Sequence, residues 1–227
     1  MREYDRNMPL IVIHVPKAGG VSSGHIFSDW YGDNFYKHYA NAVTGDLPEK
    51  LDLFGLNEPN NPLCLQGHFN RLRGFGIEDY YPSVTQFITI LRDPFELMVS
   101  HYFYVRKVGK TWKDQSRVPT CDLHTFLKDN KPNMLNHFPR EITLENYKDI
   151  IEEYFIEIGI TEQLDESMRR IGKKLGFEHR KNVGTLNTTE RDQSVPIGFR
   201  EQFMELNKLE YEVYQYCLLK FDTTEIT

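Results

Sequence analysis

The chain has 227 residues, of which 40% are hydrophobic and 26% charged, and its formal net charge at pH 7 is −6. This composition is typical of a soluble globular protein and excludes wholesale disorder. The sequence pI near 5.8 means that no overall basic field exists, so nucleic acid is not an expected partner and any anion site must be local. We expect one domain over residues 1–227, with its core over about residues 9–221.

The cysteines and the apolar runs narrow the class of protein further. Cys64, Cys121 and Cys217 are widely spaced and form no C-x-x-C pair, which favours buried thiols over a disulfide framework or a zinc site. No apolar run approaches the ~18 residues of a membrane span, and the start MREYDRNM is unlike a signal peptide. We therefore expect no membrane span and a cytoplasmic location for the chain as given.

The first predicted element is a buried strand over residues 9–15, because PLIVIHV is a short, apolar and β-branched run. A helical pattern over residues 21–31 follows Gly19 and Gly20. A strand, a tight glycine turn and a helix in this order form the phosphate-binding architecture of α/β proteins. Residues 41–61 are rich in Asn, Pro, Gly and charge, which predicts a long surface excursion.

Two more strands and a helix are predicted in the middle of the chain. The strands cover residues 63–67 and 86–91, and the apolar run QFITIL suits a strand that is covered on both faces. The helix has Asp93 as N-cap, Pro94 at its first position and Glu96 at its third, and it should run to about residue 107. Residues 106–117 then carry five basic side chains, which fit either a solvated loop or a surface for an anionic acceptor.

The C-terminal half continues the alternation of helices and strands. Helices are predicted over residues 122–129 and 143–154, followed by a strand over residues 155–160. Thr161 can cap a helix that ends before Gly176. Residues 197–221 read as one long amphipathic helix with aromatic side chains that pack in the core. This alternation predicts an α/β fold with a largely parallel central sheet flanked by helices.

The segment PKAGGVSS, residues 16–23, has the residue types of an anion-binding loop. Its glycines allow the backbone N–H groups of residues 19–22 to converge on an anion at a helix N-terminus. Lys17 adds a positive charge, and Ser22 and Ser23 add hydroxyl donors. The order differs from the nucleoside-triphosphate P-loop, G-x-x-x-x-G-K-[ST], in which the lysine follows the glycines.

A second block, ITILRDPFELMVSHYFY over residues 88–104, places Arg92 at the C-terminal end of a predicted strand. Ligands collect at this edge in open α/β sheets. The Arg92 guanidinium can bind a phosphate with two hydrogen bonds while the Ser100 hydroxyl donates from the helix. From this block alone, an ordinary ion pair between Arg92 and a neighbouring carboxylate is almost equally compatible.

Together these two blocks resemble the sulfotransferase superfamily, and most closely its carbohydrate branch of heparan- and chondroitin-type enzymes. The first motif of that branch runs P-K-[TA]-G-[GS]-T-S, and its second runs R-D-P followed by S-H-Y. The segments GITEQLDESMRRIGKKLGF, LNTTER and LEYEVYQYC also look like later parts of the family, so the resemblance spans most of the chain. It implies a P-loop-like three-layer fold and 3′-phosphoadenosine 5′-phosphosulfate (PAPS) as sulfuryl donor.

The resemblance also implies a role for each matching residue. Lys17 would contact the bridging oxygen and stabilise the leaving phosphate, while Arg92, Ser100 and Arg191 would bind the 3′-phosphate. The loop that would hold the 5′-phosphosulfate consists of Ala18, Gly19, Gly20, Val21 and Ser22. Threonine is common in the family where Ala18 and Val21 stand, so two hydroxyl donors are absent from this loop. The backbone amides are unaffected by these changes, and Ser22 and Ser23 can compensate.

Sulfuryl transfer to a hydroxyl also needs a base. His68, in LQGHFNRLRGF, follows the strand over residues 63–67, and an ordinary histidine pKa near 6.5 suits proton uptake near neutrality. In the resembling enzymes a histidine in a G-H context is the base, which favours this role for His68 over one as a strand cap. His14 is a second candidate, but we expect its side chain to hydrogen-bond to backbone and His101 to be structural. For Arg71 and Arg73, an acidic acceptor and solvent remain equally open.

The sequence therefore predicts a PAPS-dependent sulfotransferase that acts on a hydroxyl with no metal ion required, and the resemblance implies that the hydroxyl belongs to a carbohydrate. A P-loop kinase or NTPase is one alternative, but it would need a lysine after the glycines and Mg²⁺. A catalytically silent nucleotide- or glycan-binding module is the other alternative. It would be favoured if Lys17 or His68 were missing, and both are present.

Overall fold

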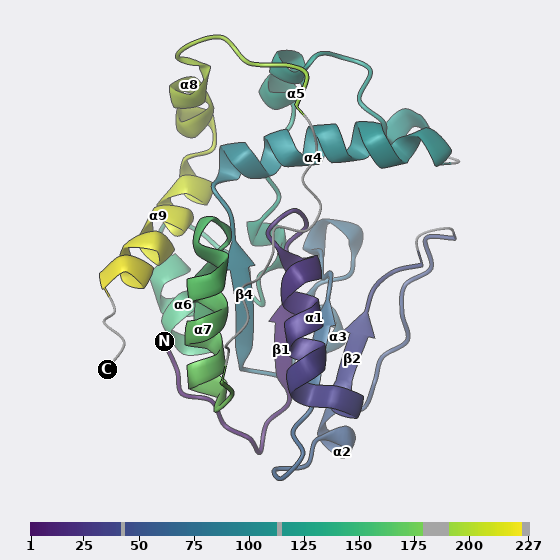
Figure 1. The fold of residues 1–227 in the computed structure, drawn as a ribbon, viewed down its shortest axis with the longest axis vertical. Helices are drawn as coiled ribbons and strands as arrows, with labels where there is room; N and C mark the ends of the chain where they lie inside the picture. Colours follow the sequence, from purple (N-terminus) through teal and green to yellow (C-terminus); the bar gives the residue numbers. More distant parts are fainter. Residues whose placement is uncertain (42–43, 113–114, 179–190, 224–227) are drawn as a thin grey trace.

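A parallel β-sheet forms the centre of the protein. The computed structural model describes residues 1–41, 44–112, 115–178 and 191–223. Within these ranges the sheet has five strands in the order β2-β3-β1-β4-β5, and all neighbours are parallel (Figure 1). The strands are β1 (Leu10–Ile13), β2 (Phe35–His38), β3 (Cys64–Gly67), β4 (Phe87–Leu91) and β5 (Phe155–Ile160). The predicted α/β fold with a parallel sheet is therefore confirmed.

Helices cover both faces of the sheet and form the outer layers (Figure 1). The helices are α1 (Gly20–Tyr31), α2 (Leu53–Leu56), α3 (Ile77–Tyr80), α4 (Pro94–Val108), α5 (Leu123–Asp129), α6 (Tyr147–Tyr154), α7 (Leu164–Leu175), α8 (Phe199–Leu206) and α9 (Lys208–Thr223). Short 3-10 helices cover Gly32–Asn34, Arg71–Arg73, Gly109–Thr111, Gln115–Arg117, Leu135–His137 and Thr161–Gln163.

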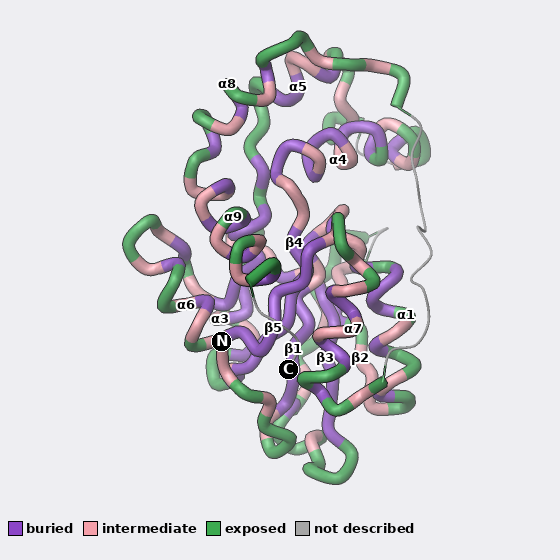
Figure 2. The backbone as a smooth tube through the Cα atoms, turned by 60° about the vertical axis from the view of Figure 1, so that its left-hand side comes forward, coloured by how far each residue is buried: buried purple, intermediate pink, exposed green. Residues whose placement is uncertain are grey.

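Two hydrophobic clusters hold these layers together. On one face, α1 and α7 pack on the sheet, and Phe27, Met168 and Ile171 share a buried cluster with alternate residues of the strands. On the other face, side chains from α3, α4, α6 and α9 form a larger cluster with the opposite set of strand residues. Figure 2 shows the consequence, because the strands run through a buried centre while exposed residues concentrate on loops and outer helix faces. Burial on both faces explains why the central strands read as continuous apolar runs.

The edge strand β2 is the strand that sequence patterning missed, and the short helices α2 and α3 were not predicted either. Its sequence FYKH is short, Lys37 is exposed, and only His38 is buried. Among the described residues β2 pairs with β3 alone, so it needs no continuous apolar run. The surface excursion predicted for residues 41–61 begins directly after this strand. Its described residues are mostly exposed, although Leu53 of the short α2 is buried.

Helix α4 lies across the C-terminal ends of the strands (Figure 1). Its start matches the sequence chemistry, because the Asp93 carboxylate accepts a hydrogen bond from the Glu96 N–H at 3.0 Å and Pro94 occupies the first turn. Leu91 ends β4, so Arg92 is held between the strand and the helix. This arrangement brings α4 over the edge of the sheet where the β1–α1 and β3 loops also emerge.

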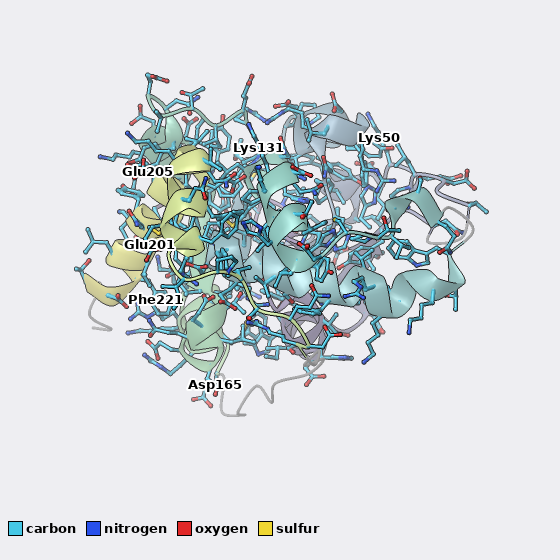
Figure 3. The ribbon with its side chains drawn as sticks, turned by 90° about the horizontal axis from the view of Figure 1, so that it is seen from above. Lys50, Lys131, Asp165, Glu201, Glu205 and Phe221 are labelled. Carbon is cyan, nitrogen blue, oxygen red and sulfur yellow. The ribbon has the colours of Figure 1, made fainter. Side chains whose placement is uncertain are left out.

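The single long helix predicted over residues 197–221 is wrong, because the structure has two helices, α8 and α9. Asn207 separates them, and its side-chain amide donates to the Phe203 carbonyl at 2.8 Å while its backbone N–H donates to the same carbonyl at 3.1 Å. An asparagine that binds nearby backbone groups competes with continuation of a helix. Seen from above in Figure 3, Glu201 and Glu205 lie on the outer side of α8, across the molecule from Lys50. The apolar pattern continues through the break, which is why it read as one helix.

The cysteines and the helix lengths agree with the composition. Cys64 and Cys217 are buried, Cys121 is half-buried, and all three are free thiols. In the part of the chain that the structure describes, no helix is both long and apolar enough to cross a membrane. The same residues contain no group of three or more His, Cys, Asp or Glu side chains that could hold a metal ion.

Candidate active site

The loop between β1 and α1 has an unusual backbone. Gly19 adopts a left-handed conformation with φ of 77° and is the N-cap residue of α1. Lys17 is also left-handed, with φ of 69°, and it is the one non-glycine residue with positive φ among those described. Such a conformation costs a residue with a Cβ on the order of 1–3 kcal/mol and is found mainly at functional sites. The loop therefore holds Lys17 in a position that ordinary backbone preferences would not select.

The N-terminus of α1 presents unpaired backbone donors. Within α1, the first N–H that has a backbone acceptor is that of Ser23, which donates to the Gly19 carbonyl at 3.0 Å. The N–H groups of residues 19–22 have no acceptor among the described residues, as expected for the first turn of a helix. Ala18 differs, because its N–H donates to the Val15 carbonyl at 3.2 Å and its side chain is 1% exposed. Four consecutive amides therefore remain available to an anion.

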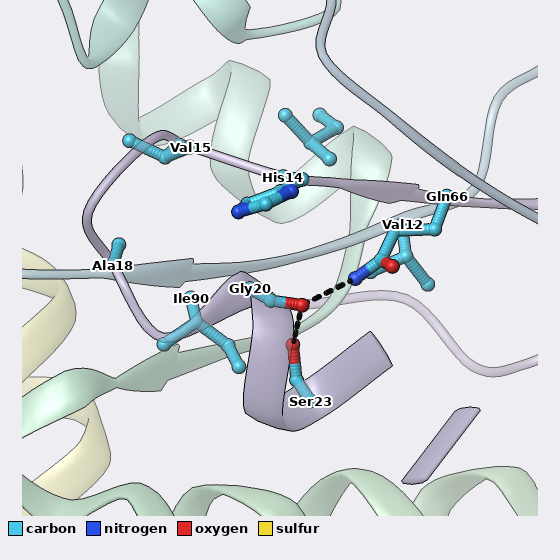
Figure 4. Close-up of a pocket in the computed structure, with 9 residues that line it drawn as sticks. Val12, His14, Val15, Ala18, Gly20, Ser23, Gln66 and Ile90 are labelled. Atoms are coloured by element: carbon cyan, nitrogen blue, oxygen red, sulfur yellow. Dashed lines mark hydrogen bonds between the residues drawn. The ribbon is translucent and has the colours of Figure 1, made fainter. Parts of the chain in front are cut away.

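The side chains of this loop divide between solvent and core. Val21 is 52% exposed, whereas Ser22 is buried. The Ser23 hydroxyl donates to the Gly20 carbonyl at 3.3 Å, and the same carbonyl accepts from the Gln66 side-chain amide at 3.2 Å (Figure 4). The Ser23 hydroxyl is thus hydrogen-bonded to the helix backbone, so it does not replace the hydroxyl donor that a threonine would supply to the loop. Of the two serines, Ser22 alone keeps a hydroxyl without a partner among the described residues.

A small cavity lies behind the loop, and Figure 4 shows the side chains of Val12, Val15, Ile90 and Gln66 around it. Its volume of about 10 Å³ corresponds to a single water-sized space. It is too small for a nucleotide, so the donor groups at the N-terminus of α1 face a different region. The cavity is lined by His14 and Gly20 as well, and these two residues are in direct contact.

Lys17 and Arg92 are neighbours in the structure. Arg92 Nη1 donates to the Lys17 carbonyl at 3.1 Å, and the Lys17 ammonium lies 3.9 Å from the centre of the Tyr104 ring on α4. Burial lowers the pKa of Lys17 from its ordinary value, and the positive charge of Arg92 lowers it further. This cation–π contact fixes the ammonium between the loop and the helix.

The sequence left two interpretations of Arg92 open, an ion pair with a carboxylate and a ligand for a phosphate, and the structure is compatible with both. Its Nε lies 4.0 Å from the Glu162 carboxylate, which also accepts the Asp93 N–H at 3.1 Å. The same Nε is buried and has no hydrogen-bond partner among the described residues. Burial lowers the pKa of Arg92, and the charge of Glu162 opposes that effect. The guanidinium is therefore anchored on the loop and retains donors for a further anion.

One face of α4 carries three of the relevant side chains. Glu96, Ser100 and Tyr104 are spaced by four residues and so share a face. Arg191 donates to Glu96 at 2.8 Å, and Tyr104 contacts Lys17. Ser100 lies between these contacts, half-buried and without a hydrogen bond among the described residues. Arg191 is thus close to the expected region, although it is paired with a carboxylate. From the sequence, residues 187–191 are expected to form a lid on the nucleotide, and residues 187–190 of this segment lie outside the described residues.

His68 follows the C-terminal end of β3 and lies beside His14, which follows β1. The distance between His68 Nε2 and His14 Nδ1 is 3.0 Å, and the Tyr39 hydroxyl lies 2.9 Å from the same His14 nitrogen. Burial and the charge of Arg73 lower the pKa of His68 to about 4. Burial, together with charge on His68, His137 and Lys17, lowers the pKa of His14 to about 3. Both rings are therefore neutral near pH 7.

The expectation that the His14 side chain binds backbone is wrong, because its partners are the two side chains of Tyr39 and His68. Its backbone N–H makes the strand contact instead, donating to the Gly67 carbonyl at 2.9 Å. The ring of His101 packs against that of Phe126, with the ring centres 6.3 Å apart.

The two arginines near His68 differ in their contacts. Arg71 forms a two-bonded ion pair with Glu78, at 2.7 and 3.2 Å, and is held in the structure by it. Arg73 is exposed and forms no ion pair among the described residues, yet it lies near enough to lower the pKa of His68. In the basic segment Arg106 donates to the Tyr102 hydroxyl at 3.1 Å. Residues 113–114 lie outside the described part.

Three residues at the site were not found by sequence reasoning. Tyr39 follows the missed strand β2, so no pattern placed it at the sheet edge. His137 belongs to a short 3-10 helix, and its ring centre lies 6.4 Å from that of His68. Burial lowers the pKa of His137 to about 3. Tyr104 had a detectable signal, because it lies four residues after Ser100 on a predicted helix.

Comparison with known proteins identifies the class of protein that this fold and loop define. Residues 4–217 match the model of the Sulfotransferase family, and the chain belongs to that family. Its members are enzymes that use PAPS as sulfuryl donor. No curated protein matches the chain.

One of three similar solved structures supports the fold. The sulfotransferase from Alicyclobacillus acidocaldarius superposes with a TM-score of 0.50 at 11% identity, covering 91% of this chain and 96% of that one. Mouse sulfotransferase SULT7A1, complexed with 3′-phosphoadenosine 5′-phosphate (PAP), has a TM-score of 0.48 at 12% identity. That match covers 77% of this chain, which spans 60% of the mouse protein. A retinol dehydratase in a complex with retinol and PAP gives 0.44 at 12% identity, covering 99% of this chain and 84% of that one.

Proposed function

We propose that the protein transfers a sulfuryl group from PAPS to an acceptor hydroxyl of a carbohydrate. The observation that carries this proposal is the set of N–H groups at residues 19–22, at the N-terminus of α1 beside Lys17. None of these groups has an acceptor in the part of the chain that the structure describes. The donor supplies an activated sulfuryl group, whose bond to the 5′-phosphate oxygen breaks as the bond from the acceptor oxygen to sulfur forms. The remaining steps belong to side chains and amides of this chain.

Binding of the 5′-phosphosulfate falls to the loop. The amides of residues 19–22 and the positive end of the α1 dipole favour an anion there without any side-chain hydroxyl. Because no side-chain hydroxyl is needed, the loop can bind the anion with Ala18 and Val21 in place of threonine. Lys17 stabilises the negative charge that develops on the leaving phosphate, an effect that is greatest in the transition state. Its left-handed backbone and its contact with Tyr104 hold the ammonium for this purpose.

Binding of the 3′-phosphate falls to Arg92 and Ser100, with Arg191 as a further ligand. Arg92 is supported by its buried Nε, which has no hydrogen-bond partner among the described residues, because an orphaned donor of a charged group is costly unless a ligand satisfies it. Ser100 is supported by its hydroxyl, which forms no hydrogen bond within the described ranges and lies on the α4 face that also contacts Arg191 and Lys17. Arg191 would have to share its charge with Glu96, since the two are 2.8 Å apart.

His68 accepts the proton of the acceptor hydroxyl. Its Nε2 faces His14, and its Nδ1 has no hydrogen bond to the described residues. With a pKa of about 4 the ring is unprotonated at neutral pH and can accept a proton. Arg73 beside it would favour an acceptor that carries negative groups. The carbohydrate class itself rests on the R-D-P and S-H-Y motifs of the carbohydrate branch.

Titration calorimetry with PAP, AMP and Mg-ATP tests the donor assignment. We expect PAP to bind at least about tenfold more tightly than AMP, since its 3′-phosphate adds charge-assisted hydrogen bonds. Arg92→Ala should remove most of this preference. Arg169→Ala, which alters an exposed arginine paired with Glu166 on α7, is the matched control and should leave the preference intact. Equal affinity for PAP and AMP, or tighter binding of Mg-ATP, would favour a kinase or a binding module instead.

A further inference from the structure

We infer that His14 is a positioning residue for His68, because it accepts the Nε2–H of His68 and leaves His68 Nδ1 as the atom that takes the proton. This inference rests on the proposed role of His68 as the base. His14 touches no reacting atom in this assignment. It does for His68 what the orienting group of a catalytic triad does for its histidine.

The backbone brings the two rings together. In the parallel pairing of β1 with β3, Ile13 is opposite Gly67, so His14 and His68 follow at equivalent positions. The His14 N–H donates to the Gly67 carbonyl at 2.9 Å, which ties the ends of both strands. The ring centres are 4.3 Å apart, and His14 Nδ1 lies 3.0 Å from His68 Nε2. This contact therefore follows from the sheet register.

The direction of the hydrogen bond follows from counting donors. Two neutral ring nitrogens at 3.0 Å can share one hydrogen, so one donates and the other accepts. His14 Nδ1 also lies 2.9 Å from the Tyr39 hydroxyl, whose pKa is raised by burial and which therefore keeps its hydrogen. Tyr39 has no other hydrogen-bond partner among the described residues. If His14 Nδ1 carried a hydrogen, the Tyr39 O–H would be left without an acceptor among the described residues.

A bare His14 Nδ1 satisfies both neighbours. Its single lone pair is shared by Tyr39 O–H and His68 Nε2–H in a three-centre hydrogen bond, and the hydrogen of neutral His14 then sits on its own Nε2. His14 stays neutral over the working pH range because burial lowers its pKa to about 3. The ring has little freedom to turn away, since Gly20 lies directly against its Cδ2 and Nε2. His68 is consequently held as the tautomer with a free Nδ1.

The hydrogen bond from His68 to His14 becomes stronger during the reaction. When His68 Nδ1 takes the acceptor proton, the ring becomes an imidazolium and its Nε2–H becomes a charge-assisted donor to His14. Charge-assisted hydrogen bonds are about twice as strong as neutral ones. The other titratable or charged groups that face His68 are Tyr39, His137 and Arg73.

Nuclear magnetic resonance of the ¹⁵N-labelled full chain tests the tautomers without any substrate. Long-range ¹H–¹⁵N spectra at pH 7, assigned with His68→Gln and His14→Asn variants, should show hydrogen on Nε2 and a bare Nδ1 in both rings. Hydrogen on His68 Nδ1 would overturn the inference. Because this measurement does not depend on turnover, it separates the inference from the proposed function, which would fail if His68→Ala kept full activity.

Kinetics give a second, independent readout. His14→Leu removes the acceptor, whereas His14→Asn keeps an oxygen near the position of Nδ1. We expect His14→Leu to lower kcat about tenfold to a hundredfold, the range for a lost hydrogen bond to a charged group, with the PAP affinity unchanged. It should also shift the acid limb of the kcat/KM profile to lower pH, because the imidazolium loses its acceptor.

His14→Asn should recover part of the rate, and His25→Leu, which alters an exposed histidine of α1, should change nothing. Equal losses in His14→Leu and His14→Asn, with an unmoved acid limb, would mean that His14 is only a packing residue. Thermal unfolding and PAP titration establish that each variant is folded. If His14→Leu does not fold, the tautomers of the wild-type chain and the pH profile of His14→Asn decide the question.

Discussion

Gly20 lies at the first position of α1, directly against the His14 ring, and its replacement by alanine tests whether the loop and the histidine pair depend on each other. A Cβ built at residue 20 would lie 1.8 Å from His14 Cδ2 and 1.9 Å from Nε2. Ordinary contacts begin near 3.4 Å, so the ring would have to withdraw by more than an ångström. It could do so only by leaving Tyr39 and His68, which hold its other edge.

Opposing effects determine whether Gly20→Ala stabilises or destabilises the folded protein. Gly20 has no positive φ, so alanine meets no backbone strain there and gains about 1 kcal/mol of helix propensity. Overpacking of a buried site costs about 1–3 kcal/mol. Two displaced hydrogen bonds add about 1 kcal/mol each when their buried partners are left unsatisfied. We therefore expect Gly20→Ala to destabilise the protein by about 2–4 kcal/mol, despite the better helix former.

Urea unfolding of four proteins measures this effect: the wild type, Gly20→Ala, His14→Ala and the double variant. In the double variant the methyl group enters the space left by the ring, so the two changes should be strongly non-additive. A coupling energy of at least about 1 kcal/mol is expected for residues in direct contact. A stable Gly20→Ala variant, or additive effects within about 0.5 kcal/mol, would refute the claim that the His14 ring requires glycine at residue 20.

Three further outcomes are expected. Lys17→Ala should slow turnover far more than it weakens PAP binding, and comparable losses in rate and affinity would argue against leaving-group stabilisation. The pKa values of His14, His68 and His137 lie near 3–4 in the folded protein and 6.5 when unfolded. Near and below pH 6.5 the unfolded chain therefore binds more protons than the folded protein. Lowering the pH from 7 to 5.5 should reduce the free energy of unfolding by up to about 1.3 kcal/mol per histidine, as measured by urea titration. Unchanged stability over this range would show that these rings are solvated. Tyr104→Leu should lower kcat several-fold while Tyr104→Phe retains it, because the ring face and not the hydroxyl contacts the ammonium; equal rates would remove Tyr104 from the site.

The parts of the fold that sequence patterning predicted are those with strong local signals. The strand QFITIL and the helix that starts at Asp93 needed only apolar runs and capping chemistry, and both lie within two residues of the prediction. The edge strand β2 and the break at Asn207 depend on tertiary pairing and on one side-chain hydrogen bond. Neither of these leaves a periodic trace in the sequence.

The candidate site shows the same division. Lys17 and Arg92 were found from their places beside glycines and at a strand end, and the structure puts them in contact. The link between His14 and His68 could not be read locally, because it depends on the register of β1 with β3. Tyr39 required the position of β2, which was missed. Motifs thus identified Lys17 and Arg92, whereas the sheet register determined the partners of His14.

The parallel order of the sheet has a consequence for how the protein gains its activity during folding. The His14–His68 contact joins residues 54 apart in the chain, and the Lys17–Arg92 contact joins residues 75 apart. Parallel pairings of such high sequence separation form slowly, because loop closure precedes any stabilising contact. The first contact requires β1 beside β3, the second requires β1 beside β4, and the site needs both. Partly folded chains should accordingly be inactive, and activity should return on refolding together with the complete sheet.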